Sequence, residues 1–261
     1  MNLVLDPVAA IGRLVINIVS MLGELAVFTA TALLGLVRPP FYLRNFGRAL
    51  LDIGFFSLPV VALTAVFTGM VLALQSYVGF SKFDSSSVIA GVVVLSLTRE
   101  LGPVLAGLMV AGRAGSAMAA EIGTMRVTDQ IDALSTLATN PMRYLVTPRL
   151  LAGLIALPLL VAVADVLGVA GGFLVSTARL GFDPTAYLQD TLTSLSRIDV
   201  ISGLVKAAVF GFIIALMGCF HGYRSRGGAQ GVGGATTSAV VSASILILAL
   251  DYVLTQAFFT P

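Results

Sequence analysis

Charged residues are scarce in this chain of 261 residues. Only 11% of the residues are Asp, Glu, Lys or Arg, whereas 57% are hydrophobic. An average soluble domain is about one quarter charged, so this chain has too little polar surface to cover a soluble globule. The mean hydropathy of +1.00 points the same way. The composition therefore indicates an integral membrane protein.

Other residue types are nearly missing, and each scarcity excludes a kind of site. The single cysteine, Cys219, excludes an internal disulfide and a multi-cysteine metal site, and the single histidine, His221, has no third ligand near it in sequence. The net charge of +2 gives no broad basic field, so we expect no nucleic-acid partner. The only lysines are Lys82 and Lys206, and no G-x-x-x-x-G-K-[ST] motif occurs. We therefore expect no metal, no ATP site and no enzymatic activity in this chain, and we interpret the glycine-rich GGAQGVGG at 227–234 as a flexible loop.

Long apolar runs are abundant instead. About 20 apolar residues are needed for a helix to cross a bilayer, and five stretches qualify: 54–80, 88–111, 150–176, 200–220 and 235–259. A sixth stretch, 8–37, carries a polar stripe at helical spacing, formed by Arg13, Asn17, Ser20 and Glu24. Such a stripe favours a helix in the plane of the interface, while an ordinary spanning helix remains an alternative.

The short loops between these runs differ in basic residues, which predicts the orientation. The loops at 38–50, 112–149 and 221–234 hold most of the arginines, so we place them in the cytoplasm, with the N-terminus cytoplasmic and the C-terminus outside. The predicted fold is all-α: one domain, 1–261, with five transmembrane helices, an N-terminal interfacial helix and a cytoplasmic coupling helix within 121–140.

Two loops contain signals for short helices. Asp183 followed by Pro184 predicts a helix start on the outer side, with Leu188, Leu192 and Leu195 on its apolar face. In the loop at 121–140, Thr128 is a candidate cap for a helix that runs to Asn140-Pro141. The apolar face of this helix, with Ile131 and Leu134, predicts a docking surface.

Small residues recur at intervals of four in two places. Ala111, Gly115 and Ala119 form one stripe, and Gly168 and Gly172 form a GxxxG motif. Such faces let helices approach closely in lipid. Packing within one copy and a dimer interface both remain open as interpretations.

Charged residues inside the apolar runs are the strongest functional signal, because a charge is expensive within a membrane. They are Arg99, Glu100, Asp165, Lys206 and Asp251. Lys206 and Asp251 fall at the same depth in their spans, so we expect them to pair.

Arg99 and Glu100 are adjacent, and adjacent residues on a helix do not face each other, so each needs its own partner. Pro103 lies four residues after Arg99 and, with Gly102, predicts a kink or an opening in the helix.

Several segments together resemble a known family. FTGMVLALQSY, LTRELGPVLAGLMVAGRAGSAMAAEIGTMRVTDQIDAL, NPMRYLVTPR and ALDYVLT are similar to the MlaE (YrbE) family of ABC-transporter permeases, over most of the chain from about residue 45. The resemblance implies a permease in the inner membrane of Gram-negative bacteria. It implies movement of phospholipids between the inner and outer membranes that maintains outer-membrane lipid asymmetry.

The resemblance also implies partners and sites. The partners are a second copy in a homodimer, cytoplasmic ATPase subunits that bind ATP and magnesium, a STAS-domain protein and a hexameric periplasmic MCE-domain protein. The implied lipid-pocket residues are Leu72, Gly79, Phe80, Phe83, Arg99 and Leu101.

The charges Glu100, Lys206 and Asp251 are candidates for gating or structure. In a lipid permease we expect Arg99 to meet the lipid phosphate and Glu100 to hold the kinked helix to a neighbouring span. A purely structural role for both residues remains open as an alternative. The candidate ATPase contacts are Glu121, Met125, Arg126, Asp129, Ile131, Asp132 and Leu134.

Two other functional classes remain open. A proton-coupled secondary transporter would use Glu100, Asp165 or Asp251 as proton carriers and would need no ATPase. The other alternative is a structural membrane subunit without a transport path.

Overall fold

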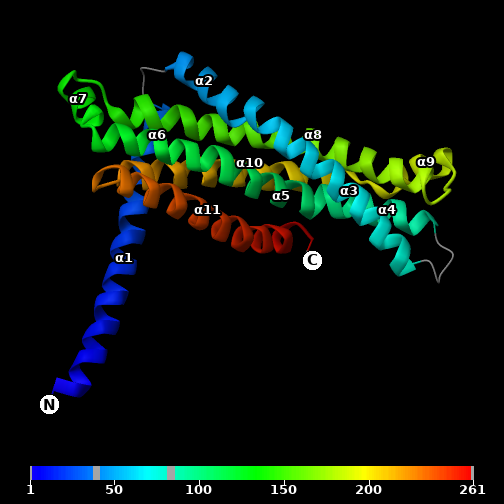
Figure 1. Ribbon diagram of the computed structural model, residues 1–261, viewed down its shortest axis with the longest axis horizontal. Helices are drawn as coiled ribbons and strands as arrows, with labels where there is room; N and C mark the ends of the chain where they lie inside the picture. Colours follow the sequence, from blue (N-terminus) through cyan, green and yellow to red (C-terminus); the bar gives the residue numbers. More distant parts are fainter. Residues whose placement is uncertain (1, 38–41, 81–85, 260–261) are drawn as a thin grey trace.

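A computed structural model describes residues 2–37, 42–80 and 86–259, and the regular structure among these residues is helical. Five segments of it are long and apolar enough to span a membrane: Leu43–Phe80, Val88–Val127, Met142–Ala178, Arg197–Tyr223 and Gly228–Phe259. They run side by side along the long axis of the molecule (Figure 1). The predicted all-α membrane fold is confirmed. The spans extend beyond the predicted apolar cores, because polar residues continue the helices past the hydrophobic run.

The first two spans are built from several shorter helices. The first span joins α2 (Leu43–Ile53), the 3₁₀ turn η1 (Phe55–Ser57) and α3 (Leu58–Phe80). The second span joins α4 (Ser86–Ser96), η3 (Leu97–Leu101), α5 (Gly102–Val110), η4 (Ala111–Gly115) and α6 (Ser116–Val127), in which η3 and η4 are π-helical turns.

The remaining spans contain longer helices. The third span begins with the π-helical turn η5 (Met142–Val146) and continues as α8 (Thr147–Ala178), while α10 (Arg197–Tyr223) and α11 (Gly228–Phe259) are the fourth and fifth. Outside the spans lie α1 (Asn2–Val37), α7 (Gln130–Thr136) and α9 (Pro184–Ser194).

The core of the bundle is centred on α10. This helix packs against α5, α6, α8 and α11, and it buries large side chains such as Phe210, Ile214 and Phe220. By contrast, α11 packs on one face only and leaves Val241, Ile245 and Tyr252 exposed. A membrane protein needs no polar outer face, so these side chains suit lipid or another membrane helix.

The small-residue stripes bring helices together within this one chain. A Cβ atom at Gly69 would lie 1.8 Å from the carbonyl oxygen of Gly168, so α3 and α8 touch through their backbones. On the other stripe, the carbonyl oxygens of Gly115 and Ala119 lie against Gly218 and Gly222 of α10. Internal packing thus accounts for both stripes.

The N-terminal helix α1 leaves the bundle at a steep angle to the spans (Figure 1). Its second half is held by Phe28 against the rings of Phe220 and Tyr223, and by an ion pair of 2.8 Å between Glu24 and Arg224. Of the predicted polar stripe, Ser20 and Glu24 are exposed, while the side chains of Arg13 and Asn17 lie outside the described residues. The steep angle is the one that an interfacial helix would have.

Two local expectations are wrong, and a third is confirmed. GGAQGVGG is not a flexible loop, because all of it except Gly227 forms the first turns of α11. Thr128 ends α6 instead of starting a helix, and α7 begins only after Asp129, which has a positive φ of 56°. The helix start at Asp183 is confirmed, since its carboxylate accepts the Ala186 N–H at 2.8 Å. The helix packs on the bundle through Tyr187 and Thr191 and leaves Leu188 and Leu192 exposed on its other face.

Candidate functional site: a charged cluster on a broken span

The second span changes its hydrogen-bonding pattern where the sequence places charges. In η3 the N–H of Gly102 donates to the carbonyl of Leu97, five residues earlier, instead of four. Pro103 follows directly, and its ring leaves the carbonyl of residue 99 without an α-helical donor. π-helical turns occur frequently at functional sites. The predicted opening of the helix at Gly102-Pro103 is confirmed.

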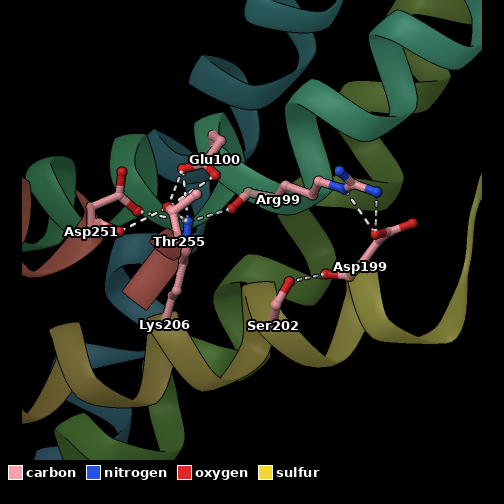
Figure 2. Close-up of polar contacts among 7 residues, drawn as sticks. All are labelled: Arg99, Glu100, Asp199, Ser202, Lys206, Asp251 and Thr255. Atoms are coloured by element: carbon pink, nitrogen blue, oxygen red, sulfur yellow. Dashed lines mark hydrogen bonds and ion pairs between the residues drawn. The ribbon is translucent and has the colours of Figure 1, made fainter. Parts of the chain in front are cut away.

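Lys206 of α10 occupies the opening. Its ammonium donates to the freed Arg99 carbonyl at 2.9 Å, to Glu100 at 2.7 Å and to the Thr255 hydroxyl at 2.7 Å (Figure 2). These bonds use all three ammonium protons. Asp251 of α11 lies 2.9 Å away as an ion pair without a hydrogen bond of its own.

Two predictions about these charges are therefore confirmed. Lys206 and Asp251 pair across neighbouring spans. Glu100 holds the broken helix to α10 through the 2.7 Å contact with Lys206, whose side chain is fully buried.

Arg99 turns away from Glu100 and has a different partner. Its Nε and Nη2 atoms lie 2.8 and 2.7 Å from Oδ1 of Asp199, at the start of α10 (Figure 2). The other oxygen of Asp199 accepts the N–H of Ser196 at 2.9 Å, so this carboxylate also caps α10. The guanidinium lies over the ring of Phe259, 4.4 Å from its centroid. The Arg99 side chain is 35% exposed, so part of its donor fork remains accessible.

The cluster carries one more negative than positive charge, because Arg99 and Lys206 face Glu100, Asp199 and Asp251. A further carboxylate lies close by. A Cβ atom at Gly102 would lie 2.2 Å from Oδ1 of Asp165, and this oxygen is buried without a hydrogen-bond partner among the residues that the structure describes. Gly102 therefore provides the space in which the Asp165 carboxylate meets the broken helix.

The implied lipid-pocket residues fall into two groups. Leu72 and Leu101 pack against the small apolar cluster around Ala73, Val93 and Leu97, next to the turn that carries Arg99. Gly79 and Phe80 lie exposed at the end of α3, roughly 10 Å further along that helix. Phe83 lies outside the described residues. A single copy thus brings Leu72, Leu101 and Arg99 together and leaves Gly79 and Phe80 apart.

The candidate ATPase contacts lie at the opposite end of the second span. Glu121 pairs with Arg149 at 2.7 Å, and Arg126 pairs with Asp132 at 2.7 Å, which ties α6 to α7. Met125 and Leu134 are partly buried against the core, and Asp129 is exposed.

Ile131 is only 1% exposed and belongs to the chain's own core, so its interpretation as an exposed docking residue is wrong. The sequence predicts a helix that runs to Asn140-Pro141, whereas α7 spans only Gln130–Thr136 and buries Ile131. The exposed apolar residue here is Leu137, at 74%.

The sequence alone does not identify two members of the cluster, Asp199 and Thr255. Asp199 lies three residues after Ser196, a spacing that signals a helix cap but does not reveal a partner a hundred residues away. Thr255 gives no signal, because a threonine in an apolar helix usually bonds its own backbone, as Thr255 also does with the Asp251 carbonyl at 2.8 Å.

Comparisons with known proteins cover nearly the whole chain. Residues 46–257 match the family model described as "Permease MlaE". A "Probable ABC transporter permease protein" from Rickettsia felis is 58% identical over 250 residues, which are 96% of each chain. The "Intermembrane phospholipid transport system permease protein MlaE" from Haemophilus influenzae is 35% identical over 258 residues, 98% of this chain and 99% of the relative. "Protein TRIGALACTOSYLDIACYLGLYCEROL 1, chloroplastic" from Arabidopsis thaliana is 38% identical over 233 residues, 89% of this chain and 67% of the relative.

Proposed function

This chain belongs to the MlaE permease family, and on that premise we propose that it is the permease subunit of an ABC transporter that moves phospholipids between the inner and outer membranes of a bacterium. Such movement maintains the lipid asymmetry of the outer membrane. ATP and magnesium bind to a separate cytoplasmic ATPase, so the assembled complex is an ATP-driven lipid translocase. The relative from Haemophilus influenzae carries a name that specifies phospholipid transport, which supports this substrate class.

The observation that carries the proposal is the partly exposed Arg99 on a broken helix within an apolar bundle. A phospholipid needs apolar walls for its acyl chains and a cation for its phosphate. Leu72 and Leu101 supply apolar surface beside η3, and Arg99 has donor groups that Asp199 does not use. We propose that this arginine meets the lipid phosphate.

The proposed assembly is a homodimer whose two copies share the lipid path. In a dimer, the exposed side chains of α3 and α11, among them Phe67, Phe80 and Tyr252, would face a second copy or the lipid. That arrangement would bring Gly79 and Phe80 to the path, from which they lie apart in one copy. A STAS-domain protein and a hexameric MCE-domain protein complete the proposed complex.

In the proposed orientation, the end of the bundle with α7 lies on the cytoplasmic side of the inner membrane. The C-terminus lies on the periplasmic side. The excess of arginines near α7 supports this orientation. The Arg99 cluster then lies in the periplasmic half of the membrane.

The test uses purified complex with fluorescent phospholipid in proteoliposomes. Arg99→Ala should abolish most ATP-dependent lipid movement while the ATPase still co-purifies. Because this change leaves the Asp199 carboxylate buried and unpaired, a second variant combines Arg99→Ala with Asp199→Asn. The matched control is Arg179→Ala, which removes an arginine at the C-terminal end of α8.

The double variant separates the two roles of Arg99. If it assembles but moves no lipid, the phosphate role stands. If it restores wild-type lipid movement, Arg99 only neutralises Asp199, and the phosphate role is wrong. A wild-type complex that moves no phospholipid with ATP would overturn the proposed function itself.

One observation favours a second candidate, a proton-coupled transporter. Asp165 presents a buried carboxylate oxygen without a partner among the described residues, against the broken helix. Carboxylates in such places act as proton carriers in transporters. Transport driven by a proton gradient without ATP, and lost in Asp165→Asn, would establish this alternative in place of the first.

A further inference from the structure

A cavity of about 440 Å³ opens at the end of the bundle that carries α7. It lies between α2, α6 and the start of α8. Its floor is apolar and buried, with Ile53, Met118 and Leu145, and its rim carries charged side chains. The volume falls within the range of about 300–1,000 Å³ that is typical of small-molecule sites.

The polar face of α2 lines this cavity. Asn45, Arg48 and Asp52 are three and four residues apart, which places them on one face of the helix. A helix at a membrane surface ordinarily turns such a face to water. Here it faces α6 and the start of α8, while Leu43 and Phe46 lie on the other side of α2.

The charges around the cavity favour an anion. Arg149 is neutralised by Glu121 at 2.7 Å. Arg113 uses only its Nη1 atom, which donates to the Asp52 carbonyl at 2.7 Å and to the Ser57 hydroxyl at 2.9 Å. Its Nε and Nη2 donors remain available, since a guanidinium has five N–H groups.

Arg48 is exposed and has no hydrogen bond or ion pair within the part of the chain that the structure describes. The carboxylate of Asp52 opposes an anion. Even with Asp52 included, the rim has three arginines and only two acidic residues, so its net charge is positive.

The position of the cavity indicates which anion. Arg113 lies eight residues before Glu121 on the second span, so the cavity reaches roughly 12 Å into the bundle from that end. Leu51, Phe55 and Phe56 of the first span are exposed and adjoin the cavity residues Asp52 and Ile53 in sequence. The Arg113 guanidinium lies 5.8 Å from the centroid of the Phe56 ring. The exposed side chains of the first span offer an apolar surface to an acyl chain, while the arginines of the cavity can bind an anionic head group.

We propose that this cavity binds the phosphate-bearing head group of an anionic phospholipid from the leaflet on the α7 side. Basic pockets between transmembrane helices recognise anionic head groups in this way. Arg48 and Arg113 bind the phosphate, and the acyl chains lie along the first span. The site is separate from the Arg99 cluster, because Arg113 lies roughly 20 Å further along the same span. It does not depend on the proposed transport function.

The experiment measures lipid binding to the purified full-length chain in detergent by native mass spectrometry. Dioleoyl phosphatidylglycerol is the anionic probe, and dioleoyl phosphatidylcholine is the zwitterionic control. Arg48→Gln should weaken phosphatidylglycerol binding about five-fold. Arg113→Gln should weaken it further, with Arg113→Lys as its charge-conserving partner. Asp52→Asn should strengthen binding, because it removes the opposing charge.

Arg179→Gln is the matched control, since it removes one arginine outside the cavity and should leave binding unchanged. Because Arg48 is exposed and unpaired in the described part of the chain, Arg48→Gln should fold like the wild type. It therefore tests the proposal even if Arg113→Gln does not fold. Unchanged phosphatidylglycerol binding in Arg48→Gln with wild-type thermal stability overturns the proposal.

Two further arms distinguish other occupants. Inorganic phosphate is added alone and in competition. If it binds with the same dependence on Arg48 while phosphatidylglycerol does not bind, the site takes a free anion and the lipid assignment is wrong. The complex with the ATPase is the second arm. If the ATPase removes phosphatidylglycerol from the wild-type chain, an acidic protein segment occupies the cavity and the proposal falls. The proposal is supported if phosphatidylglycerol stays bound both when inorganic phosphate is added and in the complex with the ATPase.

Discussion

Pro103 and Lys206 act together although they lie on different spans. The proline removes a backbone donor, and in a membrane an unsatisfied carbonyl costs several kcal/mol. The ammonium of Lys206 donates to that carbonyl at 2.9 Å and also binds Glu100. A fully buried lysine is thereby satisfied by one carbonyl, one hydroxyl and two carboxylates. The Lys206 side chain thus satisfies the carbonyl that Pro103 leaves free and connects the second, fourth and fifth spans.

The first prediction concerns this lysine. Lys206→Ala leaves Glu100 and Asp251 without their cation and should destabilise the protein by about 3–5 kcal/mol. Asp251→Asn should be milder, because Glu100 still neutralises the lysine and the cluster has a surplus negative charge. Combining Lys206→Ala with Asp251→Asn should cost less than the sum of these two single changes. Thermal unfolding of the four proteins in one detergent gives the coupling, and strict additivity would show that the pair contributes nothing.

The second prediction concerns pH at Asp183. Hydrogen bonds from the Thr185 hydroxyl and then from the Ala186 N–H hold the pKa of this carboxyl below its ordinary value. A lowered pKa means that the cap stabilises α9 above about pH 4 and that this contribution is lost as the pH falls through the folded-state pKa. Hydrogen exchange at Ala186 and Tyr187, corrected for intrinsic rates, should accelerate in acid. Asp183→Asn should remove most of that pH dependence; an identical acid response in both proteins would contradict the assignment.

Among the helical elements, the second span is the least regular. Two π-helical turns, η3 and η4, interrupt it within twenty residues, and η3 carries two of the cluster's charged residues, Arg99 and Glu100. A π-turn adds a residue to the helical turn and so changes which side chains face which neighbour. Arg99 and Glu100 reach Asp199 and Lys206 on α10 from this irregular turn.

The third prediction tests the space at this turn. A Cβ atom at Gly102 would lie 2.2 Å from Asp165 and 2.8 Å from the carbonyl oxygen of Leu97. Gly102→Ala should therefore destabilise the protein by about 1–3 kcal/mol. Gly112→Ala on the same span is the matched control, because nothing lies within 4 Å of its added carbon, and it should be neutral or slightly stabilising. Equal melting temperatures of the two variants would mean that Gly102 has no such role.

The fourth prediction concerns α7 and the proposed ATPase contact. Leu137→Asp should reduce co-purification of the ATPase while the melting temperature of the permease stays unchanged, because Leu137 is largely exposed. Ile131→Asp should lower both, since it places a charge in the chain's own core. Wild-type ATPase stoichiometry with Leu137→Asp would exclude this residue from the contact.

The molecule as a whole is a bundle whose two ends differ. One end carries α7, most arginines of the loops and the cavity at Arg113, and the opposite end carries α9 (Figure 1). The Arg99 cluster joins η3 to the first half of α10 and to the last turns of α11. The charged groups of these two sites lie at two levels of the bundle, while the middle of α10 packs through apolar and small residues. Two polar sites at different depths suit a protein that meets lipid head groups from both leaflets.

The fifth prediction tests which end is cytoplasmic. With Cys219→Ser as background, single cysteines are introduced as Leu137→Cys near α7 and Leu188→Cys on α9, both at exposed positions. A membrane-impermeant maleimide applied to intact spheroplasts should label the α9 position, and the α7 position only after lysis. The reverse pattern would invert the proposed orientation.

The amino-acid sequence by itself determined the membrane class, the five spans and the pairing of Lys206 with Asp251. These features follow from apolar run lengths and from depth along a helix, both of which are local quantities. The helix opening at Gly102-Pro103 was equally predictable, because a proline acts on its own backbone.

Only the tertiary structure decided the partner of Arg99, the inward turn of Ile131 and the cavity at Arg113. Each depends on how helices far apart in sequence rotate against one another. A shift of one or two residues in a helix start, as at α7, turns a side chain from the surface to the core. Depth in the membrane can be counted along the chain, whereas the direction in which a side chain points is set by packing.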